Sequence, residues 1–109
     1  MDRFDRPPRL AAIDVGTNSM RMIIAEVESP ATYAILDDER AQTRLGAGLY
    51  ETGQINDASF ERSLEALGTL KAIADGHDVD EMRVIAPSAI REAENGDDFV
   101  QAARERYGI

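Results

Sequence analysis

Two stretches near the start of the chain have the apolar character of buried strands. Residues 10–14 are almost wholly apolar, and residues 20–27 carry apolar side chains on both alternating faces, which is typical of a strand buried on both faces. A third strand begins at residues 32–36 and is expected to continue, with a bend, through residues 37–39 into residues 40–45. The three strands are expected to form an antiparallel meander.

The middle of the chain changes to helical spacing. A helix is expected from an Asn56 cap to about residue 75, with Gly76 ending it. Its apolar residues lie three or four positions apart, which predicts one stripe against the sheet formed by Phe60, Leu64, Leu67, Leu70 and Ile73. Gly68 costs about 1 kcal/mol relative to Ala, so it indicates a close backbone approach to the sheet. Residues 45–55 are glycine-rich and are expected to form a mobile loop.

A fourth strand follows at residues 82–86. Because a helix connects it to the meander, it is expected to run parallel to its neighbour. Pro87 breaks it, and residues 88–94 predict a short helical segment. A last helix starts at Asp97 and has an apolar face formed by Phe99, Ala103 and Tyr107. Another strand would be expected next, so we expect residues 10–109 to be a truncated domain whose fourth strand is a bare sheet edge.

Composition limits the partners that the chain can bind. Its 109 residues suffice for one small domain, and 43% hydrophobic residues are enough for a packed core. The 12 Lys and Arg residues against 21 Asp and Glu residues give a formal net charge of -9, which disfavours nucleic acid and anionic membranes as partners. An anion site in this chain would therefore depend on local backbone amides and a few arginines.

Several classes of site and location are excluded or disfavoured. The absence of cysteine excludes disulfides, thiolate metal sites and cysteine nucleophiles. His77 is the single histidine, which excludes a histidine-rich metal site, and we expect it to be an exposed loop residue. No apolar run approaches the roughly 20 residues that span a bilayer. Residues 1–9 lack the apolar core of a signal peptide, so we expect a flexible lead and a cytoplasmic protein.

The turn between the first two strands carries the candidate chemistry. Gly16 can adopt positive φ and has no side chain to hold a ligand away, so the amides of residues 15–19 can converge on one anion. Asp14 stands at the strand end, where it can orient a water or a hydrated divalent metal. Short polar side chains and a planar guanidinium that fits phosphate come from Thr17, Asn18, Ser19 and Arg21. The alternative is a polar hairpin turn without a ligand, because these residue types are common in turns.

Three blocks, taken in their order and spacing, resemble the N-terminal part of the exopolyphosphatase and guanosine pentaphosphate phosphohydrolase family. They are residues 12–21 (AIDVGTNSMR), 44–49 (RLGAGL) and 86–96 (APSAIREAENG). The resemblance covers residues 10–109 and implies an α/β, ribonuclease-H-like half-domain of the actin-like ATPase superfamily. It also implies hydrolysis of a phosphoanhydride bond in inorganic polyphosphate or guanosine pentaphosphate, Mg²⁺ as cofactor and a homodimer.

The resemblance also implies roles for individual residues. Residues 14–19 would be the first phosphate loop, and Arg21 would recognise a neighbouring phosphate. Arg91 would reach back to the phosphate chain as a catalytic residue, with Ser88 nearby and Asn95 holding that turn. Ligands of open α/β sheets gather at the carboxyl ends of parallel strands, and both segments fall there.

Arg91 also has a simpler interpretation, an ion pair with Glu94 on an exposed helix. Pro87 departs from the family, which usually has threonine there, and it removes a hydroxyl and a backbone donor. The family's general-base glutamate and its second phosphate loop lie beyond residue 109. We therefore expect Glu92 and Glu94 to be solvated carboxylates and residues 1–109 alone to show no turnover.

Two other functions stay open at this stage. A nucleotide-binding sugar kinase or chaperone of the same superfamily would share the Asp-x-Gly-Thr loop, although residues 18–21 and 88–95 favour the phosphatase. A non-catalytic interaction module is supported only by the short chain and its acidic charge.

Overall fold

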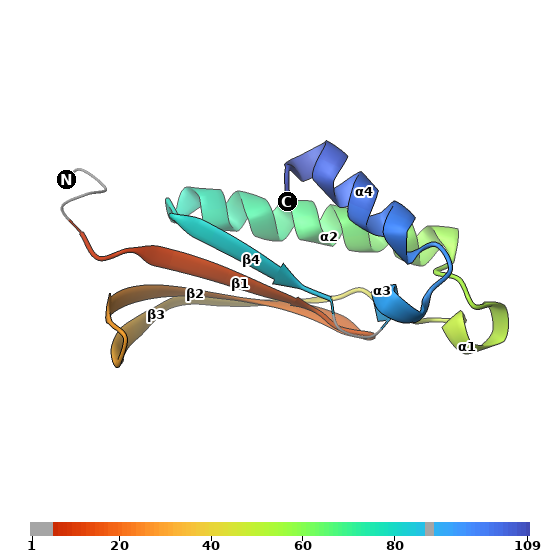
Figure 1. The fold of residues 1–109 in the computed structure, drawn as a ribbon, viewed down its shortest axis with the longest axis horizontal. Coiled ribbons are helices and arrows are strands. Elements are labelled where there is room, and N and C mark those ends of the chain that lie inside the picture. The colour runs from red at the N-terminus through yellow and green to blue at the C-terminus, as the bar shows by residue number, and fades with distance from the viewer. Residues whose placement is uncertain (1–5, 87–88) are drawn as a thin grey trace.

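The computed structural model describes residues 6–86 and 89–109, so Pro87 and Ser88, with the predictions made for them, lie outside the described residues. Figure 1 shows the elements as a ribbon. In chain order they are β1 (Arg9–Val15), β2 (Ser19–Ser29), β3 (Thr32–Gln42), α1 (Leu49–Thr52), α2 (Asp57–Gly76), β4 (Glu81–Ile85), α3 (Ala89–Glu92) and α4 (Gly96–Tyr107).

The strands form one sheet in the order β3-β2-β1-β4. β1, β2 and β3 pair antiparallel, whereas β4 pairs parallel to β1, which confirms the predicted meander and helical crossover. The irregularity in β3 is a β-bulge just before the bend predicted at residues 37–39: Ile24 pairs with Asp37 but Ala25 pairs with Ile35, which leaves Leu36 as the extra residue. The strand ends at Gln42, three residues earlier than predicted. Within the described residues β4 is an outer edge of the sheet, as expected.

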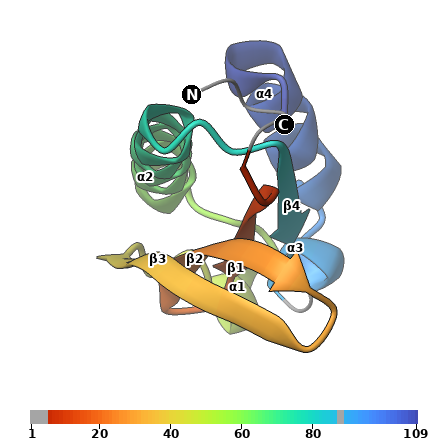
Figure 2. The same ribbon diagram turned by 90° about the vertical axis from the view of Figure 1, so that its left-hand side faces the viewer.

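Both long helices cover the same face of the sheet (Figures 1 and 2). Alternate residues of β1 and β2 point at these helices and are buried, including Ile13, Met20 and Met22. The opposite face is not covered by a helix of the described chain, and Ile23 on that face is only half-buried. The prediction that β2 is buried on both faces is therefore wrong for this part of the chain.

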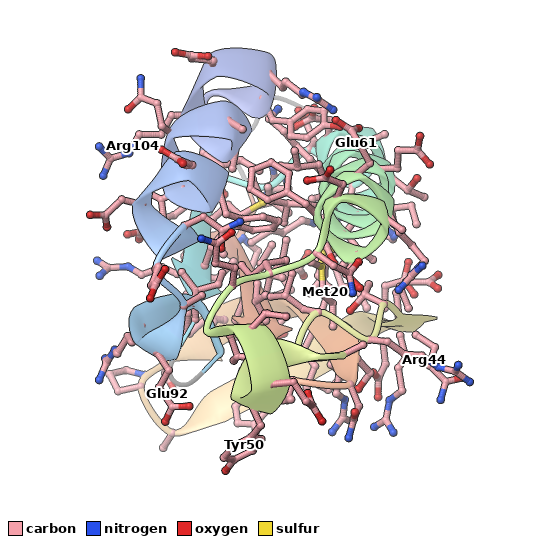
Figure 3. All side chains as sticks on the ribbon, turned by 90° about the vertical axis from the view of Figure 1, so that its right-hand side faces the viewer. Met20, Arg44, Tyr50, Glu61, Glu92 and Arg104 are labelled. Atoms are coloured by element: carbon pink, nitrogen blue, oxygen red, sulfur yellow. The ribbon has the colours of Figure 1, made fainter. Side chains whose placement is uncertain are left out.

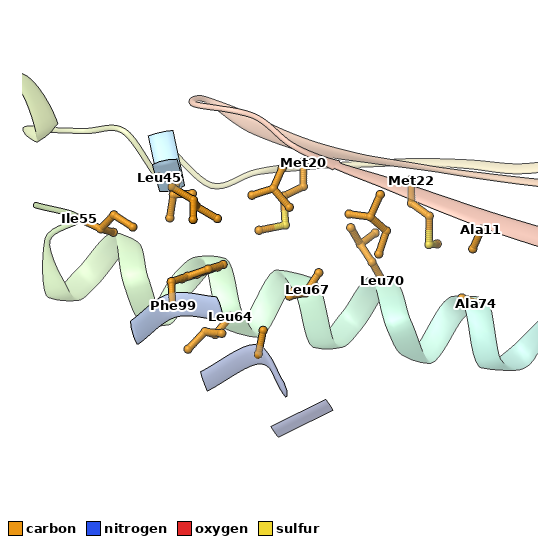
Figure 4. Close-up of a cluster of buried hydrophobic side chains, with 14 of the residues drawn as sticks. Ala11, Met20, Met22, Leu45, Ile55, Leu64, Leu67, Leu70, Ala74 and Phe99 are labelled. Atoms are coloured by element: carbon orange, nitrogen blue, oxygen red, sulfur yellow. The ribbon is translucent and has the colours of Figure 1, made fainter. Parts of the chain in front are cut away.

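The core lies between α2, α4 and the covered face of the sheet, as Figure 4 shows. The predicted stripe supplies Leu64, Leu67 and Leu70, each at most 3% exposed. Phe99 of α4 meets Phe60 of α2 edge to face, with ring centroids 5.3 Å apart. Burial of each such large apolar side chain contributes about 1.5–3 kcal/mol, so this cluster holds α2 and α4 on the sheet.

The ends and the glycine of α2 follow the prediction in part. The side chain of Asn56 accepts a hydrogen bond from the Ser59 N–H at 2.8 Å, which confirms the N-cap. Gly76 is still helical, and His77 is the C-cap. Gly68 does make a close approach, but its neighbour is α4 and not the sheet: a Cβ at Gly68 would lie 2.5 Å from the ring of Tyr107.

Two local predictions are wrong. The segment expected to be a mobile loop contains the helix α1, whose caps Gly48 and Gly53 both have φ of 75°, a conformation that glycine adopts readily. His77, expected in an exposed loop, has a half-buried side chain with Nε2 3.0 Å from Asp37 Oδ2 of β3. Its carbonyl also accepts a hydrogen bond from Arg9.

None of the described helices has the length and apolarity to cross a bilayer.

Candidate phosphate site

The candidate loop is the tight hairpin between β1 and β2. Val15 pairs with Met20, and the Gly16 N–H donates to the Ser19 carbonyl at 2.9 Å. The expected donation by the Gly16 amide to an anion is therefore not seen, and the φ of Gly16 lies outside the left-handed region. Glycine is needed here for another reason: a Cβ would lie 2.9 Å from the Ser19 carbonyl oxygen and would open the turn.

The segment after β3 holds the carbonyls at the tip of this loop. The N–H groups of Thr43 and Arg44 donate to the Asn18 carbonyl at 3.1 and 3.0 Å, and the Gly46 N–H donates to the Thr17 carbonyl at 2.9 Å. The two segments pack so closely that a Cβ at Gly46 would lie 2.3 Å from the Thr17 side chain. The sequence singled out the block at 44–49 only for its resemblance, and this supporting role was missed.

These hydrogen bonds fix the direction of the loop amides. A trans peptide is planar, so its N–H points opposite to the carbonyl of the preceding residue. No cis peptide bond occurs in the described residues. Because the carbonyls of Thr17 and Asn18 point at the segment after β3, the N–H groups of Asn18 and Ser19 point away from it, to the same side. Two successive amides on one side form the kind of concavity that binds anions.

Asp14 and Arg21 are cross-strand partners on the sheet face that the helices leave uncovered. The guanidinium of Arg21 is bound to Asp38 of β3 through two hydrogen bonds, Nε to Oδ1 at 3.1 Å and Nη2 to Oδ2 at 2.8 Å. The hydrogen bond from Arg21 lowers the pKa of the Asp38 carboxyl, and the same bond raises the pKa of Arg21. Arg21, predicted to bind phosphate, is thus held by a carboxylate in this structure.

Arg91 lies at the same end of the sheet as the loop. The parallel register pairs Asp14 of β1 with Ile85 of β4, so both strands end together, and α3 with an exposed Arg91 follows. The alternative ion pair between Arg91 and Glu94 does not form in the described structure, where Glu94 lies outside α3 and accepts a hydrogen bond from Gln54 at 3.1 Å. Both Glu92 and Glu94 are exposed, as expected for solvated carboxylates.

The model of the Ppx/GppA phosphatase family matches residues 22–109. The chain belongs to this family. It is 36% identical over 103 residues to Exopolyphosphatase 2 of Mycobacterium tuberculosis, an alignment that covers 92% of this chain and 32% of that protein. The chain thus spans about a third of the length of this relative.

Solved structures of family members confirm the expected fold. The Aquifex aeolicus member of the Ppx/GppA family superposes with a TM-score of 0.88 at 28% identity, over 94% of this chain and 33% of that one. An exopolyphosphatase from Cytophaga hutchinsonii gives a TM-score of 0.87 at 26% identity, over 93% and 32% of the two chains. The four-stranded mixed sheet with its helices is therefore the actin-like half-domain that the resemblance implied.

In this Ppx/GppA chain, the turn that follows α3 is hydrogen-bonded to the segment before α2. The Asn95 side chain bonds both backbone groups of Ile55, and the Glu94 N–H donates to the Gly53 carbonyl at 2.8 Å. A Cβ at Gly96 would lie 1.9 Å from the Ile90 carbonyl oxygen, so only glycine fits there. Asn95 holds this turn, as expected, but its partner Ile55 carried no signal in the sequence.

The residues near the loop fit a hydrated magnesium ion better than a fully protein-coordinated metal. The described residues contain no group of three or more His, Cys, Asp or Glu side chains arranged to hold a metal. Asp14 offers one exposed carboxylate at the end of β1. Mg²⁺ commonly binds through one or two carboxylates together with substrate phosphates and retained waters, and a single Asp beside a candidate phosphate loop suits that arrangement.

Proposed function

We propose that the full-length protein hydrolyses a phosphoanhydride bond in inorganic polyphosphate or in guanosine pentaphosphate, and that residues 14–19 bind one phosphate of the substrate. The observation that supports this most directly is the direction of the Asn18 and Ser19 amides, which the hydrogen bonds to Thr43, Arg44 and Gly46 impose. Family membership and the name of the mycobacterial relative favour this substrate class.

Each residue near the loop has a role in this proposal. The amides and the hydroxyls of Thr17 and Ser19 bind phosphate oxygens, and Arg91 balances charge on the transferred phosphoryl group. Asp14 would help to hold a hydrated Mg²⁺, and the bound ion would neutralise charge on the phosphate oxygens. The resemblance assigns Ser88 to phosphate binding as well. The general base that activates water is a carboxylate outside residues 1–109.

Arg21 requires an exchange of partners. Its guanidinium binds Asp38 in the structure, so contact with a phosphate would replace one anionic partner by another. This exchange is feasible because the pair is solvent-exposed, where ion pairs contribute little.

The test is phosphate release by the full-length protein, with and without Mg²⁺, from polyphosphate and from guanosine pentaphosphate. Asp14→Asn and Arg91→Gln are each expected to lower kcat by about 100-fold, the loss typical of removing a group that stabilises transition-state charge. Arg83→Gln, an exposed position on β4 that pairs with Glu81, is the matched control and should leave kcat unchanged.

Three outcomes would overturn the proposal. Robust phosphate release by residues 1–109 alone would show that the rest of the protein is not needed. Normal polyphosphate binding by the variant Asp14→Ala with Arg91→Ala would remove the site from these residues. A thermal shift of the full-length protein with ATP but none with polyphosphate would favour a nucleotide-binding member of the superfamily.

A further inference from the structure

Three charged side chains lie close together on the sheet face that the helices leave uncovered. Figure 3, which views the loop end of the molecule, labels Met20 between the sheet and α2, so the alternation of a strand turns its neighbour Arg21 to the opposite face. The register pairs Arg21 of β2 with Arg40 of β3, and Asp38 stands two positions before Arg40 on the same face. Paired side chains have Cβ atoms about 5 Å apart, and diagonal neighbours are about 7–8 Å apart. One carboxylate can therefore reach both guanidinium groups.

This cluster adjoins the candidate phosphate loop. Arg21 pairs across the hairpin with Asp14, and it follows Ser19, which carries one of the two loop amides, by two residues on the same strand. Each residue of a strand advances the chain by about 3.3 Å, so the Cα atoms of Ser19 and Arg21 are about 7 Å apart. An arginine side chain spans that distance. Arg21 can thus reach an anion at the Ser19 amide once its present partner releases it.

That partner, Asp38, occupies the donors of Arg21 that a phosphate would use. Arg21 donates from Nε to Oδ1 at 3.1 Å and from Nη2 to Oδ2 at 2.8 Å, which is the two-point contact in which a guanidinium also binds phosphate. Both side chains are 46% exposed, so a dissolved anion has access to the pair. The carboxylate therefore stands where a phosphate would bind this arginine.

Arg40 is a cation without an anionic partner of its own. It takes part in none of the ion pairs of the described chain, although the sequence has 21 acidic residues against 12 basic ones. Like charges directly across a sheet destabilise it, so Arg21 and Arg40 are stabilised by an anion near both. Asp38 supplies that charge: the hydrogen bond from Arg21 lowers the pKa of Asp38 most, and the charge of Arg40 lowers it further.

We propose that Asp38 is a latch, which holds Arg21 until a substrate phosphate takes that guanidinium and then pairs with Arg40. The inference rests on the proposed function and adds Asp38 and Arg40 to it. Asp38 is a positioning residue in this scheme, because it contacts Arg21 and not the substrate. Pairing with Arg40 keeps the displaced carboxylate from repelling the bound phosphate.

The experiment measures kcat and KM of the full-length protein with polyphosphate. Asp38→Asn removes the competing charge and is expected to lower KM about two- to fivefold, the effect of one exposed ion pair, with kcat unchanged. Asp38→Glu keeps a carboxylate and should keep a KM close to that of the unmodified protein. Arg40→Gln should raise KM by a similar factor, but only while Asp38 is present.

Two controls separate the latch from a general change of charge. Glu61, labelled in Figure 3, forms a similarly exposed two-point ion pair with Arg106 between the helices. Glu61→Gln therefore removes the same charge away from the sheet and should leave KM unchanged. In an Arg21→Gln background, Asp38→Asn should no longer lower KM, because the guanidinium for which carboxylate and phosphate compete is absent.

An unchanged or raised KM in Asp38→Asn would overturn the latch. An equal fall of KM in the Arg21→Gln background would also overturn it, since repulsion between Asp38 and the polyanion then explains the effect. An equal rise from Arg40→Gln with and without Asp38 would show that Arg40 does not receive that carboxylate.

Equilibrium binding of tripolyphosphate separates the latch from the proposed function. If the unmodified protein releases no phosphate from polyphosphate or from guanosine pentaphosphate, the proposed function fails. The latch is then decided by whether Asp38→Asn binds tripolyphosphate more tightly than the unmodified protein does. If neither protein binds it, the latch fails as well.

Discussion

The carboxamide of Asn95 is hydrogen-bonded to both backbone groups of Ile55: Oδ1 accepts from the N–H at 2.8 Å, and Nδ2 donates to the carbonyl at 2.9 Å. The two residues are 40 positions apart in the chain. The contact ties the start of α2 to the turn between α3 and α4. It thereby limits the movement of α3, which carries Arg91, relative to the rest of the fold.

Asn95→Ala should lower the free energy of unfolding by about 1–3 kcal/mol, because it leaves both backbone groups of Ile55 without their partners in a part-buried position. Equilibrium urea unfolding measures this loss. Gln101→Ala is the control, since Gln101 makes one exposed hydrogen bond to Glu105 and its loss should cost less than about 0.5 kcal/mol. Equal losses in the two variants would contradict the importance of the Asn95 contact.

The contact between Gly68 and Tyr107 predicts that the effect of Gly68→Ala on stability changes sign when the Tyr107 ring is removed. Alanine is favoured over glycine by about 1 kcal/mol inside a helix, but here its Cβ would meet the Tyr107 ring at 2.5 Å. Gly68→Ala should therefore destabilise the chain, yet stabilise it by about 0.5–1 kcal/mol once Tyr107→Ala has removed the ring. A double-mutant cycle by thermal unfolding measures this coupling, and additive effects would refute the contact.

Acid should weaken the ion pair between Glu61 of α2 and Arg106 of α4. Hydrogen bonding from Arg106 lowers the pKa of Glu61, so the pair stabilises the fold above the ordinary glutamate pKa of about 4.3. That contribution is lost as pH falls through the lowered pKa. Glu61→Gln should thus lower the midpoint of thermal unfolding slightly at neutral pH and not at all in strong acid.

Glu65→Gln, at another exposed position of α2, is the control for this pH dependence. Any difference in the midpoint of thermal unfolding between Glu65→Gln and the unmodified chain should not disappear between neutral pH and strong acid. A constant effect of Glu61→Gln from neutral pH to strong acid would show that the ion pair is not its cause.

Two buried serines of α2 should respond in opposite directions. The hydroxyl of Ser63 is buried with no hydrogen-bond partner in the described structure, so Ser63→Ala should stabilise the chain by about 0.5–1 kcal/mol, helped by helix propensity. The hydroxyl of Ser59 accepts a hydrogen bond from Arg62, so Ser59→Ala should destabilise it. Chemical denaturation distinguishes the two, and destabilisation by both variants would indicate that Ser63 has a partner.

Local patterns determined much of the fold. The spacing of Leu64, Leu67 and Leu70 and the Asn56 cap predict α2, because periodicity and capping depend on residues within a few turns of one another. The connection through a helix predicted that β4 is parallel to β1, because a helical crossover returns the chain to the end of the sheet at which the first strand began. The three motif blocks indicated the family that the comparisons then showed.

The sequence predicted which residues make up the candidate site, but it did not predict their hydrogen-bond partners. The sequence assigned Arg21 to a phosphate, yet the structure pairs it with Asp38, because β3 places that carboxylate on the same face of the sheet. It also assigned the Gly16 amide to the anion, although the hairpin uses that amide itself. Such choices of partner depend on strand register.

The sequence by itself determined where the four strands and the two long helices form, which stripe of α2 faces the core, and the family to which the chain belongs. Only the tertiary structure decided that Gly68 approaches Tyr107, that Asn95 bonds Ile55, and that the segment after β3 turns the amides of the loop. The physical reason is the range of the interactions: propensity, capping and periodicity act between near neighbours, whereas these contacts join residues that only the packed chain brings together.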